Sequence, residues 1–198
     1  MKIKKVLIIA NLFHALPRIP GLTSYLPEFG WEATVITPPL GENFQNQYNP
    51  PKVFFDNTEI IEAPHHGDVF LFWRKLFKIF GYKTDESIPE QIKGCIGITS
   101  KKSIIDILLK LYQAIFAYPD AERTWKRAAL KTGNKILEKE HFDVILSSSP
   151  FPTSHIVVAK LKKRFNIPWL ADFRDPWTKN HNYPYGKIRR YFEEKLEK

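Results

Sequence analysis

The chain has 198 residues, of which 43% are hydrophobic and 26% charged, enough for one globular domain with a sizeable core. Its single cysteine, Cys95, excludes an internal disulfide framework and a multi-cysteine zinc site, and indicates a reducing, cytoplasmic setting. The sequence predicts neither a signal peptide nor a bilayer-spanning segment, because its apolar runs are short or interrupted by charged residues.

The net charge of +9 lies in the second half of the chain. Residues 1–99 hold ten Lys or Arg and ten Asp or Glu, whereas residues 100–198 hold twenty and eleven. This excess indicates either anionic partners, such as phosphates, nucleic acid or acidic lipid, or lysines that lie solvated on helix faces. No recognised nucleic-acid-binding motif accompanies the charge, so no nucleic-acid partner is expected.

The beginning of the chain predicts a strand, a loop, a helix and a second strand. Residues 5–10 form a near-continuous apolar run, typical of a central parallel strand, and residues 31–37 form another strand. Between these two strands, four apolar residues recur at helical spacing: Leu22, Tyr25, Leu26 and Phe29. Pro27 is expected to shorten this helix and Gly30 to cap it. The order predicts a Rossmann-like parallel sheet, although the G-x-G-x-x-G fingerprint of dinucleotide binding is absent.

Residues 41–101 have the composition of an irregular insertion at the sheet edge, with short strands at 53–55 and 59–62. Within it, residues 69–82 are mostly large and apolar and contain no acid. On a helix their three cations, Arg74, Lys75 and Lys78, would share a stripe about 100° wide. Two interpretations stay open: a core-packed segment whose cations reach water, or an interfacial helix on an anionic membrane.

A helix is expected over residues 121–139, with Asp120 as its N-cap. Its expected inner face consists of Trp125, Ala129, Thr132 and Ile136. The basic residues are spread round the rest of the helix, as on a solvated surface.

Residues 142–177 predict a strand, a polar loop, a helix and a second strand. An apolar run at 144–146 ends in Ser147, Ser148 and Ser149, and a later run at 169–171 opens into a polar cluster. That cluster consists of Asp172, Arg174 and Asp175. A unit of this kind crosses over right-handed into a parallel sheet, and open α/β sheets bind ligands at the carboxyl ends of their strands. The sequence therefore places the functional site there. The final residues, 186–198, predict a charged helix without a cap signal, as if a longer protein continued.

Three stretches of this sequence carry a resemblance. They are KVLIIANLFHALPRIPGLTSYLPEFGWEATVIT, AYPDAERTWKRAAL and FDVILSSSPFPTSHIVVAKLKKRFNIPWLADFRDPWT. In order and in the paired elements F-D-V-I-x-S-S-S-P and A-D-F-R-D-P-W, they resemble the N-terminal half of GT-B fold retaining glycosyltransferases of the family-four, group-one type. The resemblance implies two Rossmann-like halves that face a cleft, the first binding acceptor and the second binding the nucleotide-sugar.

The resemblance also implies roles for individual residues. Gly21 matches a glycine whose backbone approaches the donor phosphates, although a plain turn glycine is the alternative. The matching floor of the acceptor site consists of Ser147, Ser148, Ser149 and Pro150. Many relatives have a histidine at this strand end, which this chain lacks; His155, in the first turn of the next helix, is the candidate catalytic histidine, unless it is structural. Asp172, Arg174 and Asp175 are candidate catalytic residues, and Arg18 and Arg174 are cations for the leaving diphosphate. The alternative for Arg174 is an Arg–Asp brace that fixes its loop.

The sequence therefore predicts a single Rossmann-like acceptor-binding domain at 1–198, with the C-terminal donor-binding domain absent from this chain. Its expected partners are a nucleotide-sugar donor, a glycan or lipid-linked acceptor and, through residues 69–82, an anionic membrane surface. No metal and no cofactor other than the nucleotide-sugar co-substrate is expected. The expected setting is the cytoplasm, at the inner face of the membrane, and this fragment alone is expected to be inactive. A non-catalytic Rossmann-like binding or scaffold module is the alternative.

Overall fold

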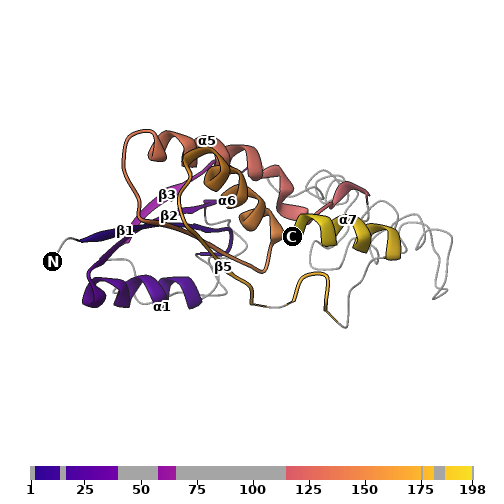
Figure 1. Ribbon diagram of the computed structural model, residues 1–198, viewed down its shortest axis with the longest axis horizontal. Coiled ribbons are helices and arrows are strands. Elements are labelled where there is room, and N and C mark those ends of the chain that lie inside the picture. The colour runs from indigo at the N-terminus through magenta and orange to yellow at the C-terminus, as the bar shows by residue number, and fades with distance from the viewer. Residues whose placement is uncertain are drawn as a thin grey trace, which may run out of the picture.

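The computed structural model describes residues 3–13, 17–39, 58–65, 115–174, 176–180 and 186–197. Within these ranges five parallel strands form one sheet in the order β3-β2-β1-β4-β5 (Figure 1). The strands are β1 (Lys4–Ala10), β2 (Trp31–Thr37), β3 (Thr58–Glu62), β4 (Val144–Ser148) and β5 (Trp169–Asp172). The predicted α/β class with a Rossmann-like sheet is confirmed.

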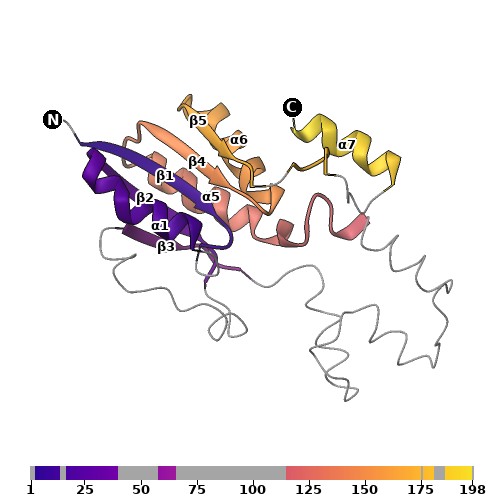
Figure 2. The ribbon, with the colours of Figure 1, turned by 90° about the horizontal axis from the view of Figure 1, so that it is seen from below.

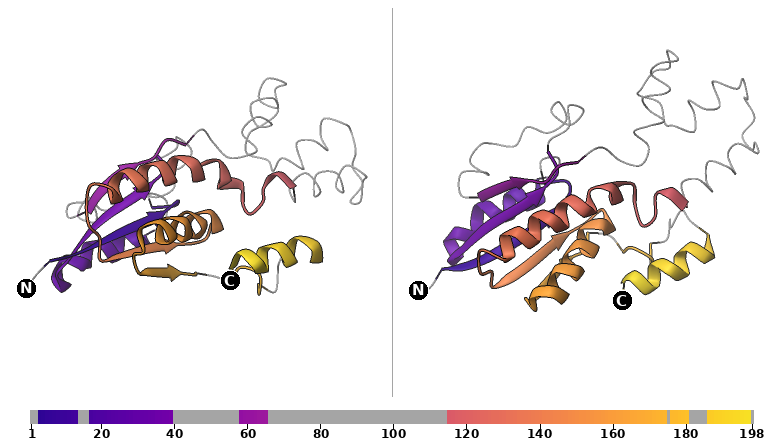
Figure 3. Two further views of the ribbon diagram at one scale, coloured as in Figure 1. Left: turned by 45° about the horizontal axis from the view of Figure 1, so that its top comes forward. Right: turned by 90° about the horizontal axis from the view of Figure 1, so that it is seen from above.

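Helices cover both faces of this sheet. Helix α1 (Arg18–Tyr25) lies on one face, and α5 (Lys126–Leu137) and α6 (Pro152–Phe165) lie on the other (Figure 3). Helix α7 (Lys187–Glu197) stands apart from these layers, on the side toward which the strands run (Figure 2). No described helix has the length and apolar character needed to cross a membrane.

The sheet separates the core into two apolar clusters, one on each face, and the central strand β1 contributes side chains to both. Leu7 and Ile9 of β1 belong to the cluster under α5 and α6, whereas Val6 and Ile8 belong to the cluster under α1. Alternate side chains of a strand point to opposite faces, so both faces of β1 are buried. This is why its sequence is almost continuously apolar.

Helix α1 differs from the prediction in the face that it buries. It ends at Tyr25, a 3₁₀ turn (η1, Leu26–Phe29) follows at Pro27, and Gly30 adopts φ 73° as the cap, as predicted. The buried residues, however, are Ile19, Pro20 and Thr23, while Leu22, Tyr25 and Phe29 are exposed. The helix begins at Arg18, inside the predicted loop, so Ile19 and Thr23 at i and i+4 set the face that contacts the sheet.

Helix α5 buries a slightly different face from the predicted one. Asp120 accepts a 2.8 Å hydrogen bond from the Glu122 N–H, but it caps a 3₁₀ turn (η3, Ala121–Thr124) that precedes α5. The buried residues at the sheet are Trp125, Ala129, Gly133 and Leu137, whereas Thr132 and Ile136 are half-buried. A Cβ atom on Gly133 would lie 2.7 Å from a Leu161 methyl group, so the glycine allows α5 and α6 to approach closely.

Two predictions fall on undescribed parts of the chain. Residues 69–82, the candidate interfacial helix, lie wholly outside the described residues, and of the expected insertion at 41–101 only 58–65 is described. The short strand expected at 59–62 is present as β3.

Candidate functional site

The strand order reverses between β1 and β4, so the polar end of β4 lies at this switch point and the polar end of β5 lies next to it. The chain runs from β1 outward to β2 and β3 on one side, and then returns to β4 and β5 on the other. Ala10 pairs with Ser148 across β1 and β4, and Ser148 pairs with Asp172 across β4 and β5. Loops at such a switch point leave a crevice that commonly binds ligands. The two motif ends are therefore adjacent, as the sequence predicted.

Asp172 connects three elements of this edge. Its Oδ1 atom lies 2.7 Å from Arg18 Nη2 at the start of α1, and its Oδ2 atom accepts a 2.9 Å hydrogen bond from Ser148 Oγ. The carboxylate is 18% exposed and the arginine side chain 55% exposed. This charge-assisted hydrogen bond joins the start of α1 to the end of β5 across the switch point, at a position that is partly open to solvent. More than half of the arginine surface stays accessible.

Ser149 fixes the loop that follows β5. Its N–H donates to the Asp172 carbonyl at 3.1 Å, and its Oγ accepts a 2.8 Å hydrogen bond from the Arg174 N–H. The Ser149 side chain is thus engaged with backbone, which favours a positioning role over ligand contact. Arg174 itself is half-buried, and Asp175 lies outside the described residues.

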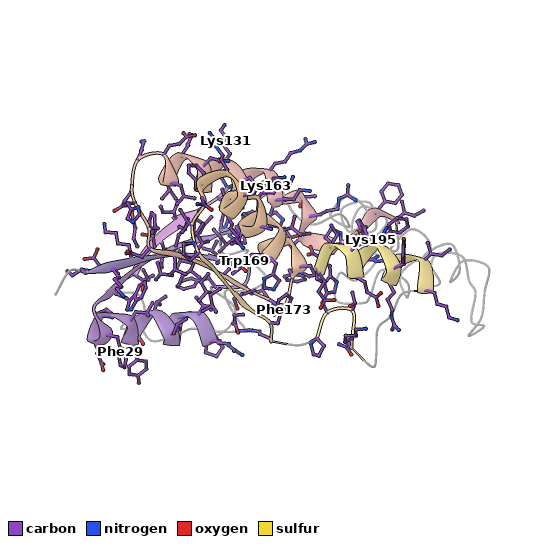
Figure 4. The ribbon with its side chains drawn as sticks, viewed as in Figure 1. Phe29, Lys131, Lys163, Trp169, Phe173 and Lys195 are labelled. Atoms are coloured by element: carbon purple, nitrogen blue, oxygen red, sulfur yellow. The ribbon has the colours of Figure 1, made fainter. Side chains whose placement is uncertain are left out.

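His155 lies beneath the edge in a chain of hydrogen bonds. Trp169 Nε1 donates to Ser147 Oγ at 2.8 Å, and Ser147 Oγ lies 2.7 Å from His155 Nδ1. The indole N–H thus uses one lone pair of the serine oxygen, and the contact between Ser147 Oγ and His155 Nδ1 is a second hydrogen bond of the same hydroxyl group. His155 is 3% exposed, and its Nε2 has no hydrogen-bond partner among the described residues. Phe173 stacks on the ring with a 4.2 Å centroid distance; Figure 4 labels Phe173, after β5, and Trp169, at the start of β5.

Burial keeps His155 neutral. It lowers the pKa of the imidazole from 6.5 to about 4, while the negative charge of Asp172 opposes the shift. At neutral pH the ring therefore carries no charge.

Asp120 holds the helix that carries His155. Its carboxylate accepts hydrogen bonds from the Thr153 N–H at 2.6 Å and the Thr153 Oγ at 2.8 Å, near the start of α6. Burial raises the pKa of Asp120, while these hydrogen bonds and the Arg189 charge act in the opposite direction. The same carboxylate caps η3, so one side chain fixes the starts of two helical segments.

Two predicted contact residues are placed differently from the expectation. Gly21 lies in the first turns of α1 and not in a loop, and its N–H already donates to the Pro17 carbonyl at 2.8 Å. That N–H is not available to a phosphate in this conformation. Ser147 is fully buried and bonded to Trp169 and His155, so it supports the site from below. Pro150 is exposed at the end of β4.

Several site residues were not identified from the sequence. Asn11, directly after β1, is buried at the same edge, and its Nδ2 has no partner among the described residues. Its position after an apolar strand is the same signal that identified the serines. Phe173, Trp169 and Asp120 act through tertiary contacts, for which the sequence offers no spacing signal. Within the described ranges no three His, Cys, Asp or Glu side chains are grouped as metal ligands. Metal-free chemistry stays a prediction.

Comparison with known proteins gives no family. No protein-family description matches the chain, and no curated protein does. Among solved structures, the chain is similar to the C-terminal domain of a hydrogenase from Pyrococcus furiosus, with 11% identity and a TM-score of 0.45, over 87% of this chain and 92% of that one. It is also similar to CalG4, the calicheamicin glycosyltransferase, with 15% identity and a TM-score of 0.45, over 98% of this chain and 38% of that one. These two neighbours differ in activity, and at these TM-scores neither decides a function.

Proposed function

We propose that residues 1–198 are the acceptor-side domain of a nucleotide-sugar-dependent retaining glycosyltransferase of the GT-B, family-four type. The observation that carries the proposal joins sequence and geometry. The two motifs on which the resemblance rests end the neighbouring strands β4 and β5, and Asp172 links them to Arg18 at the switch point of the sheet. Ligand sites of open α/β sheets occur at this position.

In this proposal the described edge positions an acceptor and stabilises charge. Arg18, held by Asp172 and half exposed, is the cation that would face the departing diphosphate. His155, neutral and buried beneath Phe173, would position Ser147 and the end of β4 rather than bind a phosphate. Catalysis then depends mainly on holding both substrates in reacting geometry.

The proposal includes a second Rossmann-like domain outside residues 1–198, which would bind most of the nucleotide-sugar. The acceptor would be a glycan or a lipid-linked glycan at the cytoplasmic side of the membrane. No metal and no further cofactor is required by this mechanism.

The test compares the protein made from the whole reading frame with residues 1–198 alone. Release of nucleoside diphosphate is measured with a panel of nucleotide-sugars, with and without simple alkyl glycosides as acceptors. We expect turnover only from the whole protein, because proximity and orientation contribute about 7–11 kcal/mol, which one half of the cleft cannot supply. Full-rate transfer by residues 1–198 would contradict the half-enzyme interpretation.

The site assignment is tested with Asp172→Asn in the whole protein. Asp143→Asn is the matched control, because Asp143 lies at the opposite edge of the sheet, where it accepts the Lys5 N–H at 2.8 Å. We expect kcat/KM to fall about 100-fold for Asp172→Asn, within the range for loss of a preorganised electrostatic group, and to stay unchanged for the control. Nucleotide-sugar or glycan binding without any turnover in the whole protein would favour the non-catalytic module instead.

A further inference from the structure

Helix α7 packs against the rest of the domain through its charged residues. Arg189 and Glu193 are 7% and 1% exposed, and Arg189 Nε donates to Glu193 Oε1 at 2.6 Å. Arg189 Nη2 also donates to the carbonyls of Ala117 and Pro119, both at 2.8 Å. A buried ion pair that loses one partner leaves an uncompensated charge, so these contacts fix the rotation of the helix about its axis.

All three acidic residues of α7, Glu193, Glu194 and Glu197, contact residues of the segment that follows β5. Trp177 Nε1 donates to Glu193 Oε2 at 2.8 Å, and the Thr178 N–H donates to Glu197 at 3.3 Å. The Lys179 ammonium lies 4.0 Å from Glu194. Every acidic residue of the helix therefore has a partner on the segment that follows β5 or within the buried pair.

The exposed side of α7, which adjoins the buried one, is apolar and basic. Its apolar residues are between 44% and 79% exposed: Ile188, Tyr191, Phe192 and Leu196. At about 100° of rotation per residue, they span an arc of about 140° that also contains Lys195, with Lys187 at its margin. Both lysines are exposed, and no acid falls within the arc (Figure 4 labels Lys195). We call this surface the α7 outer face.

A surface that combines apolar side chains with cations and excludes acids fits anionic lipid. Interfacial helices bury an apolar face at the level of the headgroups, and lysines beside it attract acidic lipids. A two-fold contact between copies of this chain would instead bring Lys187 and Lys195 toward the same lysines of the second copy, whereas the nearest acid, Glu194, lies outside the arc and 4.0 Å from the Lys179 ammonium. The helix is about 16 Å long, too short to span a bilayer.

We propose that the α7 outer face docks this domain on an anionic lipid surface, with the helix axis in the plane of the membrane. This goes beyond the proposed transferase function and does not depend on it.

The test is flotation of the purified chain with vesicles of phosphatidylcholine alone or mixed with phosphatidylglycerol, in the absence of donor and acceptor. We expect binding to the anionic vesicles only, weakening as salt is raised. Ile188→Ser with Phe192→Ser should reduce the affinity at least about tenfold through lost apolar burial. Lys187→Glu with Lys195→Glu should reduce it by at least about fivefold for each cation removed.

Matched controls use exposed residues of other helices. Leu22→Ser with Phe29→Ser removes apolar surface from α1 and η1, and Lys131→Glu with Lys163→Glu reverses two charges on α5 and α6 (Figure 4). Both controls should bind vesicles like the unchanged chain. The proposal is overturned by equal binding to neutral vesicles, by no binding at all, or by equal losses in the controls. A dimer in solution that Ile188→Ser with Phe192→Ser dissociates would assign the face to a second copy.

Discussion

Two ion pairs of nearly equal length mark two different regions of this domain. Arg18 and Asp172 lie 2.7 Å apart at the sheet edge, with 55% and 18% of their side chains exposed. Arg189 and Glu193 lie 2.6 Å apart under α7, with 7% and 1% exposed. The two pairs therefore have similar distances, but one is open to water and the other is buried in the protein. Exposure, rather than distance, decides what each pair contributes.

The buried pair also has more hydrogen-bond partners than the exposed pair. Arg189 has two carbonyl acceptors in addition to its carboxylate, and Glu193 accepts from an indole N–H. Arg18 has one described partner, Asp172, and its guanidinium remains accessible. The enclosed pair fixes a helix, whereas the accessible pair can exchange its carboxylate for another anion. The comparison predicts a large effect on stability for the Arg189–Glu193 pair and a small one for the Arg18–Asp172 pair.

The largest effect is expected for Arg189→Met. It leaves Glu193 buried without its cation, and such a loss destabilises by about 3–5 kcal/mol. Urea denaturation should report the loss of unfolding free energy, and hydrogen exchange should rise in residues 117–120 and 187–197. Arg164→Met is the control, since the Arg164–Glu138 pair is 57% and 50% exposed and should contribute less than about 1 kcal/mol. Equal effects in the two variants would contradict the comparison.

A second prediction concerns His155, a neutral histidine that is buried beneath the carboxyl edge of the sheet. His155 has a pKa of about 4 when folded, below its ordinary 6.5, so the unfolded chain binds more protons between these values. Stability from this residue is thus complete above about pH 6.5 and decreases as the pH falls toward 4, by up to about 3 kcal/mol. His155→Asn, whose side-chain carbonyl can still accept from Ser147, should remove this component.

The measurement is the unfolding free energy of both proteins from pH 7.5 to pH 4. Other titrating groups are common to the two chains and cancel in the difference. A parallel pH dependence of the two proteins would show that His155 is not buried neutral.

The sequence predicted the features that depend on periodicity and strand order. The apolar run of β1, the serines that end β4 and the Asp172 cluster that ends β5 are local signals, and parallel topology brings their ends together. The buried faces of the helices were less predictable. In α5 the buried face includes Gly133, which lets Leu161 approach closely, and in α1, which begins at Arg18, Leu22 and Phe29 are exposed.

The positioning contacts could not be read from the sequence, because they join residues that are distant along the chain. Trp169 reaches Ser147 across 22 residues, and Asp120 reaches Thr153 across 33. Helix α7 reverses the usual relation altogether, since its buried residues are Arg189 and Glu193 and its apolar residues are exposed. A hydrophobic pattern alone predicts the opposite orientation.

The smallest stability effect is expected at the accessible pair. A double-mutant cycle with Arg18→Met and Asp172→Asn isolates the coupling between the two side chains. We expect a coupling of about 0.2–1 kcal/mol by urea denaturation, because solvent and side-chain entropy offset most of the Coulomb attraction at a half-exposed site. The same cycle with Arg164→Met and Glu138→Gln supplies a surface reference. A coupling as large as that of the Arg189–Glu193 pair would mean that Arg18 is locked to Asp172 and unavailable to a diphosphate. A small coupling means that the arginine can leave its carboxylate at little cost in stability, as a residue must if it is to hold a transient anion at this edge.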